Sequence, residues 1–195
     1  MDLILLQPGD KAVFPSDNGW DSGGSLIDQP GVVLPKVGNM QPTLDKKNCI
    51  ELVSVHQGMK QQVTTDVSNS ARTSGRPIIT EFTCAKYVDK TSVKLYDYCL
   101  RAETIGKNKD NPSYIFVLRN SGDKTYNIMT FALRDALISE IQLQTHPDDM
   151  PTEQFKLNFT EILWVYSVQL ANMQVKGNVP AGWSLAHNRA ITQFT

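Results

Sequence analysis

The sequence has few of the features that mark metal-binding, membrane or nucleic-acid-binding proteins. Its three cysteines, Cys49, Cys84 and Cys99, form no C-x-x-C pair, which excludes the usual zinc pattern and predicts reduced thiols in the core. The longest apolar runs, such as Leu3–Leu6, hold four or five residues, whereas a membrane-spanning helix needs about 20. The 19 Lys and Arg residues are balanced by 20 Asp and Glu residues, so no basic surplus is available for phosphates. We therefore expect neither nucleic-acid binding nor membrane insertion.

Catalytic signatures are equally scarce. The chain has three histidines, His56, His146 and His187, and none belongs to a G-x-S-x-G motif or a Cys–His nucleophile signature. The run Gly19–Gly24 lacks the spacing of a phosphate-binding loop. The acidic segment 146–149, His-Pro-Asp-Asp, indicates a solvated turn, because proline and aspartate favour turns. The sequence thus predicts no enzyme, no cofactor, no catalytic residue and no metal site.

The N-terminus gives no sign of a targeting segment. Residues Met1–Pro8 carry no basic stretch, and their apolar run is too short for a signal peptide. We expect the protein to be cytoplasmic and, where it is secreted, to leave by a route without a cleaved signal peptide.

Length and composition are those of a single globular domain, with 195 residues, a mass of 21.8 kDa and 41% apolar residues. Residues 8–49 hold five of the ten prolines and six of the twelve glycines. Because proline removes a ladder hydrogen bond and glycine weakens strands, we expect a long insertion at about 8–49 after a first strand, Asp2–Gln7. Residues at about 171–195 form a predicted C-terminal extension. Its aromatic residues Trp183 and Phe194 either anchor a partner or cap the barrel.

From Ile50 onward, apolar and polar residues alternate with the period of two that is typical of strands. The last strand is predicted from Phe155 to Val168. Its apolar positions change from odd to even numbers, which predicts a bulge near Thr160–Glu161. The segment Gln61–Gly75 is polar and rich in small residues, and is predicted to be a loop. Ile50–Gln57 is a short apolar-rich run, and the other predicted strands are Ile78–Tyr87, Tyr114–Arg119, Thr125–Leu133 and Ala136–Leu143.

One segment, Asp89–Glu103, has the period of a helix, with Leu95, Cys99 and Ala102 on one face. Thr91 or Ser92 is the expected N-cap, and Gly106 the expected end. Many strands and a single helix predict a mainly β fold. We expect a β-barrel of antiparallel strands with one short flanking α-helix and long loops.

Three stretches of the sequence form a further pattern: EFTCAKYVDKTSVKL at 81–95, LRNSGDK at 118–124 and PTEQFKLNFTEILWVY at 151–166. In this order and spacing they resemble the Hcp (TssD) family, the tube proteins of bacterial type VI secretion systems. The resemblance covers the first strand and about residues 50–170. Two departures stand out: Val93 occupies a helix-start position where family members often have proline, and the 8–49 segment is longer than the expected loop.

The resemblance implies a homo-hexameric ring that stacks into a tube, carries a VgrG-type spike, moves inside a contractile sheath and binds small effectors in its lumen. It also implies that an extended loop takes part in ring-on-ring contact. The matching ring-stacking residues are Gln61, Val63, Thr64, Thr65, Asp66, Val67, Ser68, Asn69, Arg72, Thr73, Ser74, Gly75, Arg76 and Pro77.

Two other functions fit the same residues. A tail-tube protein of a phage-like contractile particle has a related fold, and genomic neighbours would separate it from a secretion protein. A monomeric small-ligand-binding barrel would need an internal cavity, whereas small barrels are commonly filled by side chains.

Overall fold

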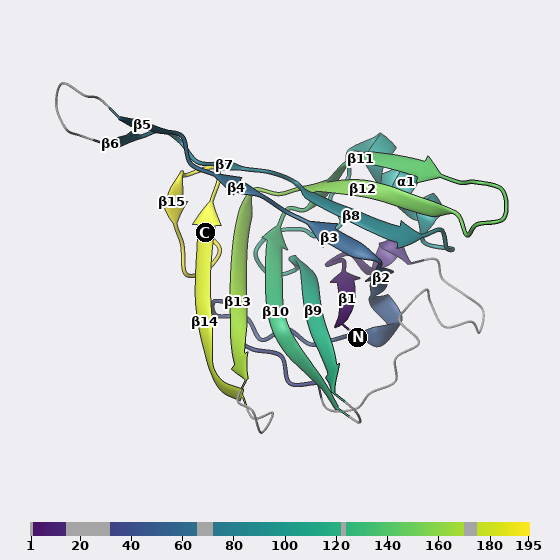
Figure 1. The fold of residues 1–195 in the computed structure, drawn as a ribbon, viewed down its shortest axis with the longest axis horizontal. Coiled ribbons are helices and arrows are strands. Elements are labelled where there is room, and N and C mark those ends of the chain that lie inside the picture. The colour runs from purple at the N-terminus through teal and green to yellow at the C-terminus, as the bar shows by residue number, and fades with distance from the viewer. Residues whose placement is uncertain (1, 15–31, 66–71, 122–123, 170–174) are drawn as a thin grey trace.

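The computed structural model describes residues 2–14, 32–65, 72–121, 124–169 and 175–195. These residues form a mainly β structure with one α-helix, α1 (Ser92–Arg101), and two short 3-10 turns, η1 (Lys11–Val13) and η2 (Lys46–Asn48) (Figure 1). The strands are β1 (Asp2–Gln7), β2 (Ile50–Leu52), β3 (Ser54–His56), β4 (Met59–Lys60), β5 (Val63–Thr65), β6 (Arg72–Ser74), β7 (Ile78–Ile79), β8 (Phe82–Tyr87), β9 (Ser113–Ser121), β10 (Lys124–Arg134), β11 (Leu137–Gln144), β12 (Thr152–Asn158), β13 (Glu161–Gln169), β14 (Val175–Ser184) and β15 (Arg189–Ala190).

The strands make two main sheets. A large sheet has the order β15-β14-β13-β10-β9-β1-β2, and a small sheet has the order β11-β12-β8-β3. In Figure 1 the large sheet lies at the lower left, and the small sheet with α1 at the upper right. All described pairings are antiparallel, so the predicted fold class is confirmed. The expected barrel is not closed: within the described residues no ladder joins the edges of the two sheets, and the result is a barrel-like sandwich.

Two segments that were predicted as single strands each contain a corner, at which the chain passes from one sheet to the other. The segment Ile50–Gln57 divides at Val53 into β2 of the large sheet and β3 of the small sheet. The predicted bulge near Thr160–Glu161 is wrong for the same reason. There β12 of the small sheet ends at Asn158, and β13 begins in the large sheet. The amide of Thr160 donates to the carbonyl of Arg134 (3.1 Å), which fixes this corner.

Strand β13 is covered by apolar residues on both of its faces. Ile162 packs into the main core between the two sheets, together with Phe82, Phe155 and Leu157. Its neighbour Leu163 points to the opposite face, where Val37, Ile191 and Phe194 cover it. The N-terminal segment 32–49 covers a further part of that face, with Leu34 and Cys49 packed on β1 and β9. A strand with two covered faces has apolar residues at both odd and even positions.

Helix α1 packs through Leu95, which is fully buried. Ala102 adopts a left-handed conformation (φ 52°) directly after the last helical residue and is exposed. Ala102 therefore ends the helix, and the predicted end at Gly106 is wrong. Thr91 does occupy the N-cap position, but its hydroxyl donates to the Asp89 carboxylate (2.6 Å) instead of capping a helical amide.

The cysteines are free thiols, as predicted, with Cys49 and Cys84 fully buried and Cys99 half-buried. Burial raises the pKa of Cys84 to about 12. Burial, followed by the nearby Asp45 carboxylate, raises the pKa of Cys49 to about 12. None of the helices among the described residues is long and apolar enough to cross a membrane.

Candidate functional site

A two-stranded ribbon projects beyond both sheets at the upper left of Figure 1. We call it the arm and define it as residues 59–65 and 72–79. An inner ladder pairs β4 with β7 and an outer ladder pairs β5 with β6. The arm continues from β3 and leads into β8, so both of its ends are attached to the small sheet.

Most of the predicted ring-stacking residues lie on the arm. Asp66, Val67, Ser68 and Asn69 lie outside the described residues. The predicted strand Ile78–Tyr87 includes β7 of the inner ladder, but its partner Met59–Lys60 was not predicted, because a strand of two residues shows no periodicity. The described predicted residues are Gln61 before β5; Val63, Thr64 and Thr65 in β5; Arg72, Thr73 and Ser74 in β6; and Gly75, Arg76 and Pro77 after β6.

The arm exposes apolar surface. Met59 is 51% exposed, Val63 is 55% exposed and Ile78 is 44% exposed. Exposed apolar residues that gather on one projecting element mark a surface suited to contact with another molecule.

The arm has a break between its two ladders, at residues 61–62 and 75–77. Two hydrogen bonds cross the break: the amide of Gly75 donates to the Gln62 carbonyl (3.1 Å), and the Gln61 side chain donates to the Gly75 carbonyl (2.7 Å). A third bond joins the break to the body, because the Arg76 guanidinium donates to the carbonyl of Leu185.

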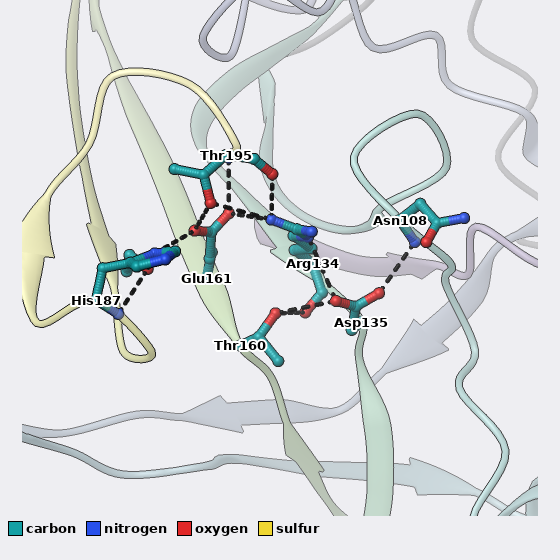
Figure 2. Close-up of polar contacts among 8 residues, drawn as sticks. Asn108, Arg134, Asp135, Thr160, Glu161, His187 and Thr195 are labelled. Carbon is teal, nitrogen blue, oxygen red and sulfur yellow. Dashed lines mark hydrogen bonds and ion pairs between the residues drawn. The ribbon is translucent and has the colours of Figure 1, made fainter.

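The turn 184–187, which contains Leu185, contacts Glu161, which is the centre of a polar cluster (Figure 2). Its carboxylate, 2% exposed, accepts hydrogen bonds from Arg134 Nη1 (2.9 Å) and from the amide of Thr195 (3.0 Å). Burial alone raises the pKa of Glu161. Hydrogen bonds from Thr195, Arg134 and Ser184 outweigh burial and lower that pKa to about 2. The carboxylate is thus held ionised.

Asp135 extends the cluster on the other side of Arg134. Its carboxylate accepts from the amide of Asn108 (3.0 Å) and from the hydroxyl of Thr160 (3.2 Å), and lies 3.3 Å from Arg134 Nε. Figure 2 shows Arg134 between the two carboxylates. The cluster therefore joins β10, β13, the sheet corner at Thr160 and the C-terminal tail.

The cluster contains a serine, a histidine and a glutamate, but not in a catalytic arrangement. His187 Nδ1 lies 3.1 Å from the Ser184 hydroxyl and 3.8 Å from Glu161 Oε1. A catalytic triad needs the serine and the carboxylate on different ring nitrogens, whereas here both face Nδ1. Ser184 is also completely buried. These residues hold the turn in place.

The other candidate residues lie apart from one another. His56 is exposed on β3, and His146 lies in the exposed turn between β11 and β12. Among the described residues, no group of three or more His, Cys, Asp or Glu side chains could hold a metal. Phe194 is buried and Trp183 packs against the main core, so both residues of the tail contact the body.

The comparisons with known proteins agree on one family. A family model described as "Type VI secretion system effector, Hcp" matches residues 36–166. This chain belongs to the Hcp family. Hcp proteins are structural and not enzymatic, which confirms that prediction. The matched range includes the arm and begins within the 8–49 segment.

Solved structures support the Hcp fold at low sequence identity. A type six secretion system protein has 19% identity and a TM-score of 0.73, with 98% of this chain and 100% of that chain covered. Hcp1 from Salmonella typhimurium has 17% identity and a TM-score of 0.64, with 97% and 99% covered. The secreted protein Hcp3 from Pseudomonas aeruginosa has 13% identity and a TM-score of 0.51, with 94% and 96% covered. No curated protein sequence matches the chain.

In this Hcp, two of the three stretches that carried the resemblance meet at a buried ion pair. Lys86 on β8 is completely buried, and its Nζ lies 2.8 Å from Oε1 of Glu153 on β12. Ser92, the first residue of α1, donates to the same oxygen (2.8 Å), and Tyr96 donates to Oε2 (2.8 Å). This network fixes α1 on the small sheet.

Proposed function

We propose that this Hcp is a subunit of the type VI secretion inner tube, in which six copies form a ring and rings stack through the arm. The observation that carries the proposal is the arm itself, a ribbon that leaves the body of an Hcp protein with Met59, Val63 and Ile78 exposed. Burying these side chains against a neighbouring ring removes apolar surface from water.

The open sandwich also supports a cyclic assembly. Sheet edges that are not closed within one subunit can be paired or covered by the next subunit, and a heterologous interface that closes gives a ring. A formal net charge of -1 keeps mutual repulsion among copies low.

The proposal includes the partners and location that an inner tube requires. A VgrG-type spike would close the tip, a contractile sheath would surround the tube, and small effectors would bind in the lumen. The rings would assemble in the cytoplasm and leave the cell without cleavage of a signal peptide.

The first experiment is the solution mass of the full chain by sedimentation, with negative-stain images of the same fraction. A hexamer of 21.8 kDa subunits has a mass of about 131 kDa and gives ring-shaped images. A monodisperse monomer of 21.8 kDa at every accessible concentration would overturn the proposal.

The second experiment separates the arm from the ring. Val63→Asp places a charge on the arm and should leave the ring mass unchanged while preventing tubes, because an unpaired carboxylate would be buried at the contact. Val93→Asp is the matched control, since Val93 is 71% exposed on α1 and lies outside the arm. Tubes that form equally well from the Val63→Asp variant would exclude the arm from stacking.

A further inference from the structure

The break between the two ladders is the place where the arm can bend. Within it, residues 61–62 and 75–77 have no ladder pairing, and two hydrogen bonds of Gly75 join the strands there. Exposed backbone with few hydrogen bonds and few apolar contacts opens more readily than a packed sheet. A ribbon of this kind needs a further attachment to point in one direction.

Arg76 supplies that attachment, since it lies inside the break and binds the carbonyl of Leu185. Leu185 is a fixed point: its amide donates to the carbonyl of Thr160 (3.0 Å), and its side chain packs against the main core. The contact therefore ties the bending point of the arm to the corner between the two sheets.

The position of Leu185 depends on the turn 184–187. The hydroxyl of Ser184 accepts from the amide of His187 (3.3 Å) and contacts its ring (3.1 Å). Ser184 also donates to Glu161, which holds Thr195 at the end of the tail. A change in this turn would move the Leu185 carbonyl and with it the anchor of the arm.

We propose that the turn 184–187 and Arg76 form a clasp that fixes the direction of the arm and so regulates stacking. The inference rests on the proposed function, because it assumes that the arm contacts the next ring. An arm held in one direction before a second ring arrives loses less conformational entropy on binding. Loosening the turn weakens stacking even when the arm sequence is unchanged.

The clasp is tested first by amide hydrogen exchange of the full chain, read on peptides covering 59–65 and 72–79. Arg76→Ala should speed exchange there by about tenfold, the lower end of the effect expected from loss of one hydrogen bond with a charged donor. Lys60→Ala is the matched control, because it removes the same charge from an exposed arm position outside the break. Equal exchange in the two variants and the natural chain would overturn the clasp.

A second variant tests the clasp with a substitution outside the arm. Ser184→Ala removes the hydroxyl that holds the turn and leaves every arm residue in place. It should also speed arm exchange by about the same factor, because the Leu185 carbonyl loses its fixed position. Unchanged arm exchange in Ser184→Ala, with faster exchange in the turn itself, would contradict coupling through the turn.

Stacking is then measured as tube length in negative-stain images at a fixed protein concentration. Rings of Arg76→Ala should keep the hexamer mass and give shorter tubes than Lys60→Ala. If the variant tubes match those of the natural chain, the clasp does not regulate stacking, while the proposed function stands. If the natural chain makes no rings, the proposed function fails, and hydrogen exchange still decides whether the clasp exists.

Discussion

The buried ion pair between Lys86 and Glu153 gives the sharpest test of how this fold is held together. Both side chains are completely buried, and Glu153 also accepts from Ser92 and Tyr96. Glu153→Gln keeps the shape of the side chain but leaves the Lys86 ammonium in the core without its closest carboxylate. Asp89, 3.0 Å from Lys86 and one-third exposed, still compensates part of the charge.

Removing one partner of a buried pair costs about 3–5 kcal/mol, and the remaining Asp89 contact places this variant near the lower value, about 3 kcal/mol. A chain of this length has a urea m-value of about 2–3 kcal/mol/M, so the urea midpoint should fall by about 1–1.5 M. The natural chain and each variant are unfolded at the same protein concentration, because assembly adds to apparent stability.

The matched control is Glu140→Gln, which breaks an ion pair with Lys156 between β11 and β12 of the same sheet, with both side chains about one-third exposed. Its urea midpoint should barely move, since exposed pairs contribute little. The double variant Lys86→Met with Glu153→Leu should be more stable than Glu153→Gln alone, because no charge remains unpaired. A loss below about 1 kcal/mol in Glu153→Gln would refute the reasoning that this pair is tightly coupled.

Three further predictions follow from buried groups. Glu161, with a pKa of 4.5 in the unfolded chain and about 2 in the folded one, contributes about 3 kcal/mol above pH 5, and this is lost as the pH falls from 4.5 towards 2. The difference in free energy of unfolding between the natural chain and Glu161→Gln, measured with urea, should therefore shrink by about 1 kcal/mol when the pH is lowered from 7 to 4. A difference that stays constant over this pH range would contradict the low pKa. Gly182→Ala should cost about 1–3 kcal/mol in thermal unfolding, because the new methyl would lie 2.3 Å from Leu163, whereas Gly177→Ala, with open space around it, should be neutral. Cys84, whose pKa burial raises to about 12, should react with iodoacetamide at pH 8 only after unfolding, and rapid labelling of its peptide in the native protein would argue against its burial.

Local patterns in the sequence correctly predicted elements that lie wholly within one sheet or one helix. The first strand, Asp2–Gln7, has the predicted bounds, and the helix lies within the predicted segment Asp89–Glu103. The corner at Val53 was missed because Ile50–Gln57 is a short apolar-rich run that was predicted as one strand, although the partner sheet changes at Val53. Periodicity reports which side of a strand is apolar, and it contains no information about which sheet receives the strand.

The clasp could not be predicted for a different reason. Arg76 and Leu185 are 109 residues apart, and Glu161 meets Thr195 from 34 residues away. No local signal marks such pairs, since polar residues in turns and tails are common and their partners are set by the packing of the sheets. The arm was predicted as a loop from its polar residues, whereas backbone pairing between β5 and β6 organises it as a ribbon.

The double covering of the large sheet has a consequence for how this Hcp meets other molecules. The central strands are buried on one side by the small sheet and on the other by the 32–49 segment and the tail. A partner that binds on this outer side contacts exposed residues of the covering segment, such as Val33, which is 78% exposed. The strand residues beneath that segment are not accessible to it. Substitutions in the covering segment can therefore change the contact surface at little cost to folding, whereas substitutions at Leu163 or Phe116 mainly change stability.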